Sequence, residues 1–194
     1  MDKNPQIFYE IELKSVFDKA KYDQLNDFLN SNEKFKLLNK ESITTEFYKA
    51  DADQTDVRLR NSDKTIELIC KKGLVTKICR KEIQIPLASM EKLEHLKQVF
   101  DFLPLEKQPK TLKHKQEFMY KYKGFDYCIC LQHIEDFAYL LEVEYLADKD
   151  ESELHEPNLL AILKELGLEL ISGEKFLKRV EDYKAGKVTI DYPV

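Results

Sequence analysis

The sequence lacks the apolar run that a signal peptide or a membrane-spanning helix requires. Its opening, MDKNPQIFYEIELK, reaches alternating charged residues at once. With 194 residues, 43% hydrophobic and 35% charged, the composition is that of a globular protein rather than a disordered chain, and two full domains would be cramped. We therefore expect a cytoplasmic protein that folds as a single domain over residues 1–194, with no membrane contact.

Paired spacings of soft-metal ligands are also absent. The cysteines form no C-x-x-C pair, and the four histidines show no H-x-x-x-H spacing. Cys128 and Cys130 stand two apart within an apolar run, and we read all four cysteines as reduced, buried strand residues. The spacing therefore argues against a soft-metal site.

Basic residues are not in excess. The chain has 31 Lys and Arg against 36 Asp and Glu, a net charge of −5 and a pI near 5.5. A protein that coats nucleic acid through general electrostatics carries a basic footprint, so no general nucleic-acid binding is expected. Any site for a polyanion must be local, and the oligomeric state stays open between monomer and homodimer.

What the sequence does have is period-two alternation of charged and apolar residues, which places successive side chains on opposite faces of a strand. Residues 8–16 set Tyr9, Ile11 and Leu13 against Glu10, Glu12 and Lys14. Four more segments repeat this pattern, so that five strands each carry one charged face; they are residues 57–60, 80–87, 113–122 and 141–145.

The remaining patterns complete an α+β arrangement. Further strands are expected at residues 43–49, 64–71 and 125–132, the last entered through a turn at Lys123-Gly124. Helical spacing appears at residues 18–30, 89–100, 152–166 and 174–185. We predict a closed antiparallel eight-stranded β-barrel over about residues 7–147, covered by helices, with C-terminal helices over about 151–185 and a tail over 186–194.

Closure of such a sheet would gather the charged faces in one interior. Four carboxylates there are hard oxygen ligands suited to Mg²⁺ or Mn²⁺: Glu10, Glu12, Glu142 and Glu144. Six cations offer donors to a chain of phosphates: Lys14, Arg58, Arg60, Arg80, Lys113 and Lys115. Either cluster alone is costly to bury, so together they predict a metal–polyphosphate ligand. The competing explanation is a set of interior salt bridges and nothing more.

Five segments, in order, resemble the motifs of the CYTH, or triphosphate tunnel metalloenzyme, family. Glu10-Ile11-Glu12-Leu13-Lys14 is similar to the E-x-E-x-K signature that opens these proteins. The other four resemble L-R-x-R, R-x-E, K-x-R and F-x-E-x-E; they are Val57-Arg58-Leu59-Arg60, Arg80-Lys81-Glu82, Leu112-Lys113-His114-Lys115 and Leu140-Leu141-Glu142-Val143-Glu144. The matching segments span residues 7 to about 180.

The resemblance implies a metal-dependent hydrolase that releases the terminal phosphate of an inorganic, organic or nucleoside triphosphate by water attack. A class IV adenylyl cyclase, forming cyclic AMP and pyrophosphate from ATP, is the alternative within the family. A non-catalytic polyphosphate- or nucleotide-binding module is the alternative outside enzymes.

The resemblance also implies roles for particular residues. Lys14, Glu12 and Tyr48 are the catalytic candidates, with Phe47 as an alternative occupant of the Tyr48 position. A deprotonated Lys14, its pKa lowered by neighbouring cations, is the suggested base. Glu82 joins the metal ligands. The substrate-binding set gains Lys175 and one of two adjacent lysines: spacing from Gly73 favours Lys72, whereas alternation favours Lys71.

The chain departs from the family pattern at four positions. Lys115 stands where Arg is frequent, which keeps the charge but loses bidentate geometry. Gln132 replaces an Asp, which removes one metal or water contact, and Ala138 replaces a Gly. Gln84 replaces a second acid found in some relatives.

Overall fold

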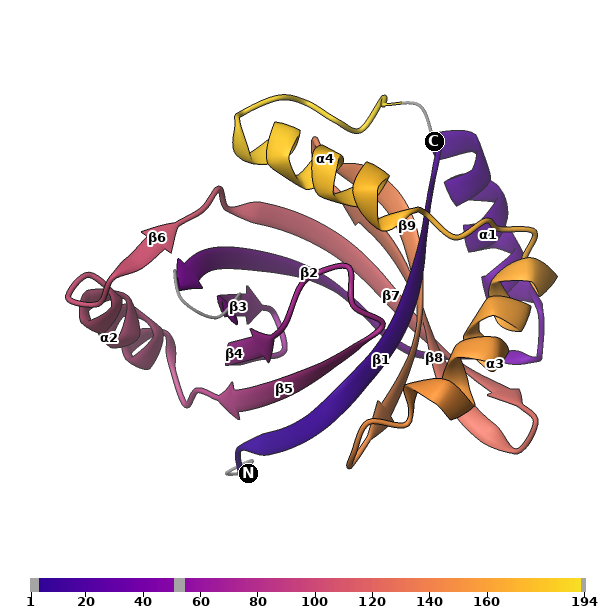
Figure 1. Ribbon diagram of the computed structural model, residues 1–194, viewed down its shortest axis with the longest axis horizontal. Coiled ribbons are helices and arrows are strands. Elements are labelled where there is room, and N and C mark those ends of the chain that lie inside the picture. The colour runs from indigo at the N-terminus through magenta and orange to yellow at the C-terminus, as the bar shows by residue number, and fades with distance from the viewer. Residues whose placement is uncertain (1–3, 51–54, 193–194) are drawn as a thin grey trace.

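The computed structural model describes residues 4–50 and 55–192, and it is built on one antiparallel sheet. Eight strands each pair with two neighbours in the order β2-β3-β4-β5-β1-β9-β8-β7 and back to β2, which closes a ring (Figure 1). The ninth, β6, pairs with the far end of β2. The strands are β1 (Gln6–Phe17), β2 (Phe35–Ala50), β3 (Thr55–Ser62), β4 (Ile66–Lys72), β5 (Cys79–Pro86), β6 (Leu105–Lys107), β7 (Thr111–Tyr122), β8 (Phe125–Ile134) and β9 (Ala138–Ala147). The predicted closed arrangement of eight antiparallel strands is confirmed.

The first and last strands of the ring lie side by side. In the β1–β9 register Glu12 stands opposite Glu144, and Lys14 stands opposite Glu142. The predicted turn between β7 and β8 is also present. Lys123 has φ 48° and Gly124 has φ 87°, so both central residues take the positive φ that a two-residue type I′ hairpin needs.

Four helices of the described chain pack against the ring at the predicted places: α1 (Lys19–Ser31), α2 (Met90–Phe100), α3 (Ser152–Glu165) and α4 (Gly173–Lys184). The first three cover its outer face, whereas α4 packs at one end of the ring. Helices α1 and α3 lie on one side of the ring, and α2 lies on the opposite side next to β6 (Figure 1). Three of the helices begin at a side-chain cap, from Asp18, Ser89 and Ser172. Ordinary capping and amphipathic spacing thus explain where the helices form.

The main apolar core lies between the ring and helices α1 and α3. It contains fully buried residues from both layers, among them Ile11, Phe118, Ile129 and Leu159. A buried polar group also joins the layers, because Asn158 of α3 donates to the Tyr127 hydroxyl at 2.9 Å. The outer face of the ring is therefore a conventional sheet-on-helix interface, which leaves the inner face to the charged residues.

Two features of the sheet differ from the prediction. Strand β2 begins at Phe35 rather than at residue 43, and its register shifts between Leu37 and Asn39. This bulge interrupts the alternation that was used to locate strands. Strand β6 is three residues long and was not predicted, since so short a segment carries no periodic signal.

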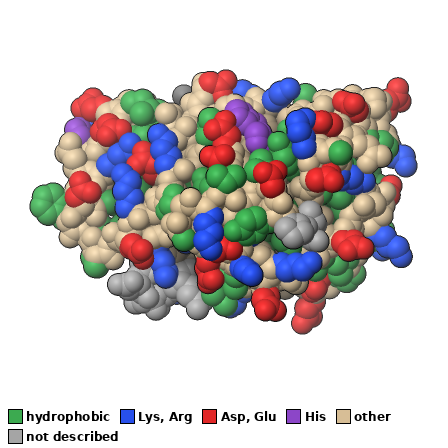
Figure 2. All heavy atoms as spheres, turned by 90° about the horizontal axis from the view of Figure 1, so that it is seen from above, with side chains coloured by type: hydrophobic (Ala, Val, Ile, Leu, Met, Phe, Trp, Pro, Cys, Tyr) green, Lys and Arg blue, Asp and Glu red, His purple; other side chains and the backbone are tan. Residues whose placement is uncertain are grey.

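The described helices and surface bear on two other expectations. None of the helices in residues 4–50 and 55–192 combines the length and apolarity needed to cross a membrane. On the face that Figure 2 shows, acidic and basic side chains are interspersed. This mixing agrees with a polyanion site that is local rather than spread over the surface.

Candidate functional site

Charged side chains from the alternating strands meet inside the ring. On β1 the residues facing outward, Ile11 and Leu13, belong to the apolar core, whereas Glu10 and Glu12 point the other way. Glu12 is only 4% exposed, so its charge must be matched within the ring. Its cationic partners are Arg80 of β5 and Lys14 of its own strand, whereas its register partner on β9 is a second carboxylate, Glu144.

Ion pairs connect the first strand to its neighbours. The Glu12 carboxylate accepts from Arg80 at 2.8 Å and from Lys14 at 2.9 Å, and Lys14 also reaches Glu142 at 3.4 Å. Burial by itself would raise the pKa of Glu12, but Lys14, Arg80 and Lys71 hold this pKa well below its usual range. Glu12 is therefore ionised at neutral pH.

Lys71, and not Lys72, is the interior lysine of β4. Its ammonium pairs with Glu10 and lies 2.6 Å from Glu82, and the residue is 3% exposed. Lys72 stands opposite Lys81 in the register and lies on the exposed face. The alternation was thus the better guide than the spacing from Gly73.

Three carboxylates form the candidate metal site. One oxygen each from Glu10, Glu12 and Glu144 lies within 4.8 Å of the other two. Burial raises the pKa of Glu144 to about 7; Lys115 opposes this rise, while Glu10 and Glu142 add to it. An oxygen-only set of this kind suits Mg²⁺ or Mn²⁺, and a cation there would keep all three carboxylates ionised.

The other two predicted metal ligands, Glu82 and Glu142, are not part of this trio among the described residues. Glu82 pairs with Lys71 and accepts from the Gln84 amide at 2.8 Å. Glu142 pairs with Lys14 and accepts from the Gln132 amide. Gln132, which stands where the CYTH-like motif predicts an Asp, therefore holds a neighbouring carboxylate in place by donating to it.

Cations gather on the opposite arc of the ring, on β3 and β7. Arg58 donates through Nε to Asp56 at 2.8 Å, and Lys115 lies 2.5 Å from Glu117. By contrast, Arg60 and Lys113 make no hydrogen bond or ion pair with any described residue, and Arg60 Nε is buried without a partner. Burial, with Arg60 next in importance, lowers the pKa of Lys113 to about 7.

The expectation of a deprotonated Lys14 is wrong for this structure. Burial favours the neutral amine, but Glu12 and Glu142 outweigh it and raise the pKa of Lys14. The lowered pKa was predicted from neighbouring cations, whereas the folded ring places the Lys14 ammonium 2.9 Å from Glu12 and 3.4 Å from Glu142. Among the described residues, burial lowers the pKa of Lys113 instead.

Tyr48 does not face the interior. Its ring packs edge-on against Phe100 of α2, with centroids 4.9 Å apart, in an apolar cluster on the outer face of the ring. The alternative, Phe47, has the interior register position opposite Arg58, whose guanidinium lies 5.2 Å from the Phe47 ring centroid. The catalytic assignment of Tyr48 therefore fails, because β2 turns its hydroxyl side outward.

Helix α4 packs at the Lys14 end of the ring through an apolar residue. The Phe176 ring lies 4.8 Å from the Lys14 ammonium and joins a cluster with Val16 and Leu140. Lys175, the predicted basic residue of this helix, is exposed. It is placed near this end of the ring but outside the group of interior cations.

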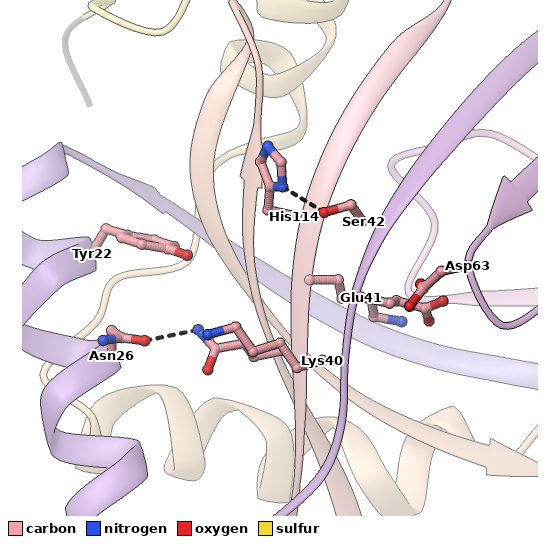
Figure 3. A pocket seen from close by; sticks show the side chains of 9 residues that line it. Tyr22, Asn26, Lys40, Glu41, Ser42, Asp63 and His114 are labelled. Atoms are coloured by element: carbon pink, nitrogen blue, oxygen red, sulfur yellow. Dashed lines mark hydrogen bonds between the residues drawn. The ribbon is translucent and has the colours of Figure 1, made fainter.

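A pocket of about 490 Å³ lies beside this site, between α1 and strands β2 and β7. Figure 3 shows Tyr22 and Asn26 reaching toward it from α1, and the imidazole of His114 bonded to the Ser42 hydroxyl at 2.8 Å. Lys115 also lines the pocket, so it connects this cavity with the charged interior.

A second group of possible ligands was missed by the sequence analysis. One ligand atom each from Glu117, Cys128, Cys130 and Glu144 lies within 4.8 Å of the others. All four cysteines of the chain are free, but only Cys130 is buried, which corrects the expectation that all are. The signal that was available is the period-two spacing of Cys128 and Cys130, which puts both thiols on one face of β8.

Comparisons with known proteins support the fold. No family model and no curated protein sequence matches the chain. Among solved structures, the PH1819 protein of Pyrococcus horikoshii superimposes with a TM-score of 0.66 at 20% identity, over 90% of this chain and 99% of that one. A candidate adenylate cyclase from Bacillus halodurans gives 0.63 at 18% identity, over 89% and 97%.

A third structure is a candidate adenylyl cyclase from Hippeastrum that is described as having a dominant triphosphatase activity. It gives a TM-score of 0.57 at 17% identity, over 93% of this chain and 96% of that one. At such low identity the likeness shows a shared fold. The fold that the CYTH-like motifs implied is therefore confirmed by the closed ring of strands and by the similar solved structures.

Proposed function

We propose that this chain, with the fold its CYTH-like motifs predicted, is a metal-dependent triphosphatase that releases the terminal phosphate of a triphosphate by water attack. The proposal combines two halves of one interior, a carboxylate trio and a set of cations, which face each other across the ring. Inorganic triphosphate is the substrate that this arrangement explains best, because charged side chains alone account for binding of the phosphates.

The observation that carries the proposal is the pair of unmatched cations, Arg60 and Lys113. Most charges inside the ring have an ion-pair partner, as interior salt bridges would require, but Arg60 and Lys113 make no ion pair among the described residues, and Glu142 only partly offsets the lowering of the Lys113 pKa. Burying a cation without an anion is costly. An anionic ligand that reaches both residues removes that cost, and it would return the pKa of Lys113 toward its usual range.

The carboxylate trio fits the divalent metal that the resemblance implies. Glu10, Glu12 and Glu144 offer only oxygen ligands. They come from the adjacent strands β1 and β9, which hold one oxygen of each residue within 4.8 Å of the other two. These three residues would hold Mg²⁺ or Mn²⁺. When bound, such a cation offsets charge on phosphate oxygens and acidifies a water molecule.

The chain's own side chains account for binding and positioning. Arg58, Arg60 and Lys113 would hold the phosphates and offset the charge that develops as the terminal P–O bond breaks. Lys14, protonated beside Glu12 and Glu142, acts as a donor and not as a base. Water adds to the terminal phosphorus, and the bridging oxygen leaves with the remaining diphosphate.

The test is to incubate the pure protein with inorganic triphosphate, thiamine triphosphate and ATP, each with Mg²⁺ or Mn²⁺, and to identify the products. Inorganic triphosphate should be the best substrate and should yield pyrophosphate plus phosphate. ATP, where it is used, should give ADP. Thiamine triphosphate should give the diphosphate.

Two results would overturn this assignment in different ways. Cyclic AMP plus pyrophosphate from ATP, with inorganic triphosphate left intact, would make the chain an adenylyl cyclase on the same fold. Tight triphosphate binding with no product from any substrate would make it a binding module.

A further inference from the structure

Three adjacent strands bring two thiols and two carboxylates together on the inner face of the ring. Cys130 of β8 is the register partner of Glu117 on β7, and Cys128 is the partner of Glu144 on β9. Because the strands pair directly, the ring itself holds the four side chains at neighbouring positions. Cys130 is fully buried, and the other three are half-buried.

The distances in this cluster are those of a metal site that needs little adjustment. One ligand atom of each residue lies within 4.8 Å of the other three, and the two Sγ atoms are 3.5 Å apart. In a tetrahedral zinc site, Zn–S bonds of about 2.3 Å set two sulfurs about 3.8 Å apart. The sulfur pair is thus already close to the spacing that zinc requires.

We propose that Glu117, Cys128, Cys130 and Glu144 form a second metal site, selective for a thiophilic divalent cation such as Zn²⁺. Two thiolates favour zinc over Mg²⁺, which prefers oxygen ligands and keeps its water. The site is chemically distinct from the oxygen-only trio, yet both contain Glu144. Zinc at the thiolate site therefore draws on a carboxylate that the trio also needs.

Charge sets the conditions for binding at this site. The Lys115 ammonium lies 2.5 Å from Glu117 and supplies positive charge to the cluster in the metal-free protein. A bound cation replaces that charge, so Lys115 and the metal compete for Glu117. Each thiol that binds exchanges its S–H bond for an S–metal bond and releases one proton to solvent.

Cobalt(II) is the probe, because a tetrahedral thiolate site gives it a sulfur-to-metal charge-transfer band that oxygen ligands do not give. The reduced full-length protein is titrated with Co²⁺, without any triphosphate, and the band is then displaced with Zn²⁺. We expect one equivalent of Co²⁺ to produce the band and one equivalent of Zn²⁺ to remove it.

The variants locate the site. Cys128→Ser with Cys130→Ser should abolish the band and weaken zinc binding by roughly 100-fold or more, since losing an outer-shell partner alone costs about 10- to 100-fold. Cys70→Ser with Cys79→Ser is the matched control, because it also removes two thiols but leaves the cluster intact, and it should behave as the unaltered protein. Lys115→Met should tighten zinc binding by removing the competing ammonium.

An unaltered protein without the band, or a band that survives in the Cys128/Cys130 variant, would overturn the proposal. Alkylation of the native protein, read by mass spectrometry, gives a second measurement that does not depend on how the variants fold. Zinc should protect Cys128, the half-buried thiol of the pair, and leave the labelling of Cys70 unchanged; equal labelling of Cys128 with and without zinc would count against the site. Neither readout involves triphosphate turnover, so a failure here is distinguishable from a failure of the proposed function.

Discussion

The two faces of the same strands bury opposite kinds of side chain, apolar on the outer face of the ring and charged on the inner face. On the outer face of the ring, fully buried apolar residues such as Ile11 and Phe118 pack against helices α1 and α3. On the inner face, Glu12 of β1 and Arg80 of β5 are almost as deeply buried, yet they form an ion pair. The backbone is shared, so the difference lies entirely in the side chains.

This contrast separates what holds the fold from what serves a ligand. Apolar burial on the outer face stabilises the protein in proportion to the area removed from water. Interior ion pairs contribute little net stability, and unmatched cations such as Arg60 and Lys113 reduce it. We infer that the outer face makes the protein stable and that the inner face is kept charged at a cost in stability.

Metal removal should have the largest effect on turnover, and it should act only through the carboxylates on the inner face. With inorganic triphosphate as substrate, EDTA should lower turnover by at least about 1,000-fold, equivalent to roughly 4 kcal/mol. Unfolding followed by circular dichroism should change little. Mg²⁺ or Mn²⁺ should restore the activity. Undiminished turnover in EDTA-treated protein would contradict the proposal that the carboxylate trio holds a metal needed for catalysis.

Phe118→Ala should show the reverse pattern. Phe118 is fully buried in the outer core, and the cavity left by its truncation should cost about 3–5 kcal/mol in the free energy of unfolding. Urea denaturation measures this loss. Turnover per folded molecule, measured below the melting transition, should stay near the original value, and a large loss of it would show that the two faces are not separable.

Arg60→Ala should lower kcat/KM for inorganic triphosphate by an amount equivalent to about 2–4 kcal/mol, the range for removing one preorganised donor. Its unfolding free energy should change little, because Arg60 makes no hydrogen bond or ion pair among the described residues and acts on Glu82 only at longer range. Lys72→Ala is the control, since Lys72 lies on the outward face of β4. Steady-state kinetics in which both variants behave alike would contradict the inward assignment.

Lys113→Met should stabilise the ligand-free protein by about 1–2 kcal/mol at pH 7, because it removes a poorly solvated cation. The folded pKa of Lys113, about 7, lies below its usual value of 10.5. Between these values the unfolded chain binds the proton and the folded protein does not, so stability rises with pH across this window. Urea denaturation at several pH values should show that the variant loses this slope. A variant less stable than the unaltered protein at pH 7 would count against the unmatched charge.

Much of the division between the two faces could be predicted from the sequence because it is local. Side-chain direction in a strand alternates with period two, so Glu10 and Arg58 could be assigned to the charged faces from the sequence, whereas the choice between Lys71 and Lys72 stayed open. Ring closure was predicted because it would bring the acidic first and last strands together and gather the charged faces in one interior. The choice between Tyr48 and Phe47 stayed open in the sequence, and the register of β2 with β3 decides it by placing Phe47 opposite Arg58.

The rest depended on distances between strands, which no spacing along the chain supplies. The raised pKa of Lys14 results from carboxylates on its own strand and on β9. The gathering of Cys128 and Cys130 with Glu117 and Glu144 needs the register of three strands at once. These parts of the site could be found only after the pairing was known.

The most direct test of the account is the unfolding temperature with and without a non-hydrolysable imido analogue of inorganic triphosphate, in the presence of Mg²⁺. For the unaltered protein the temperature should rise with analogue concentration, by the equivalent of about 2.7 kcal/mol at one hundred times the dissociation constant. In a variant carrying Arg60→Ala and Lys113→Met, the ligand-free protein should start out more stable and gain almost nothing from the analogue. An unaltered protein that gains nothing, or a variant that gains as much, would contradict the claim that the interior cations are kept for a triphosphate.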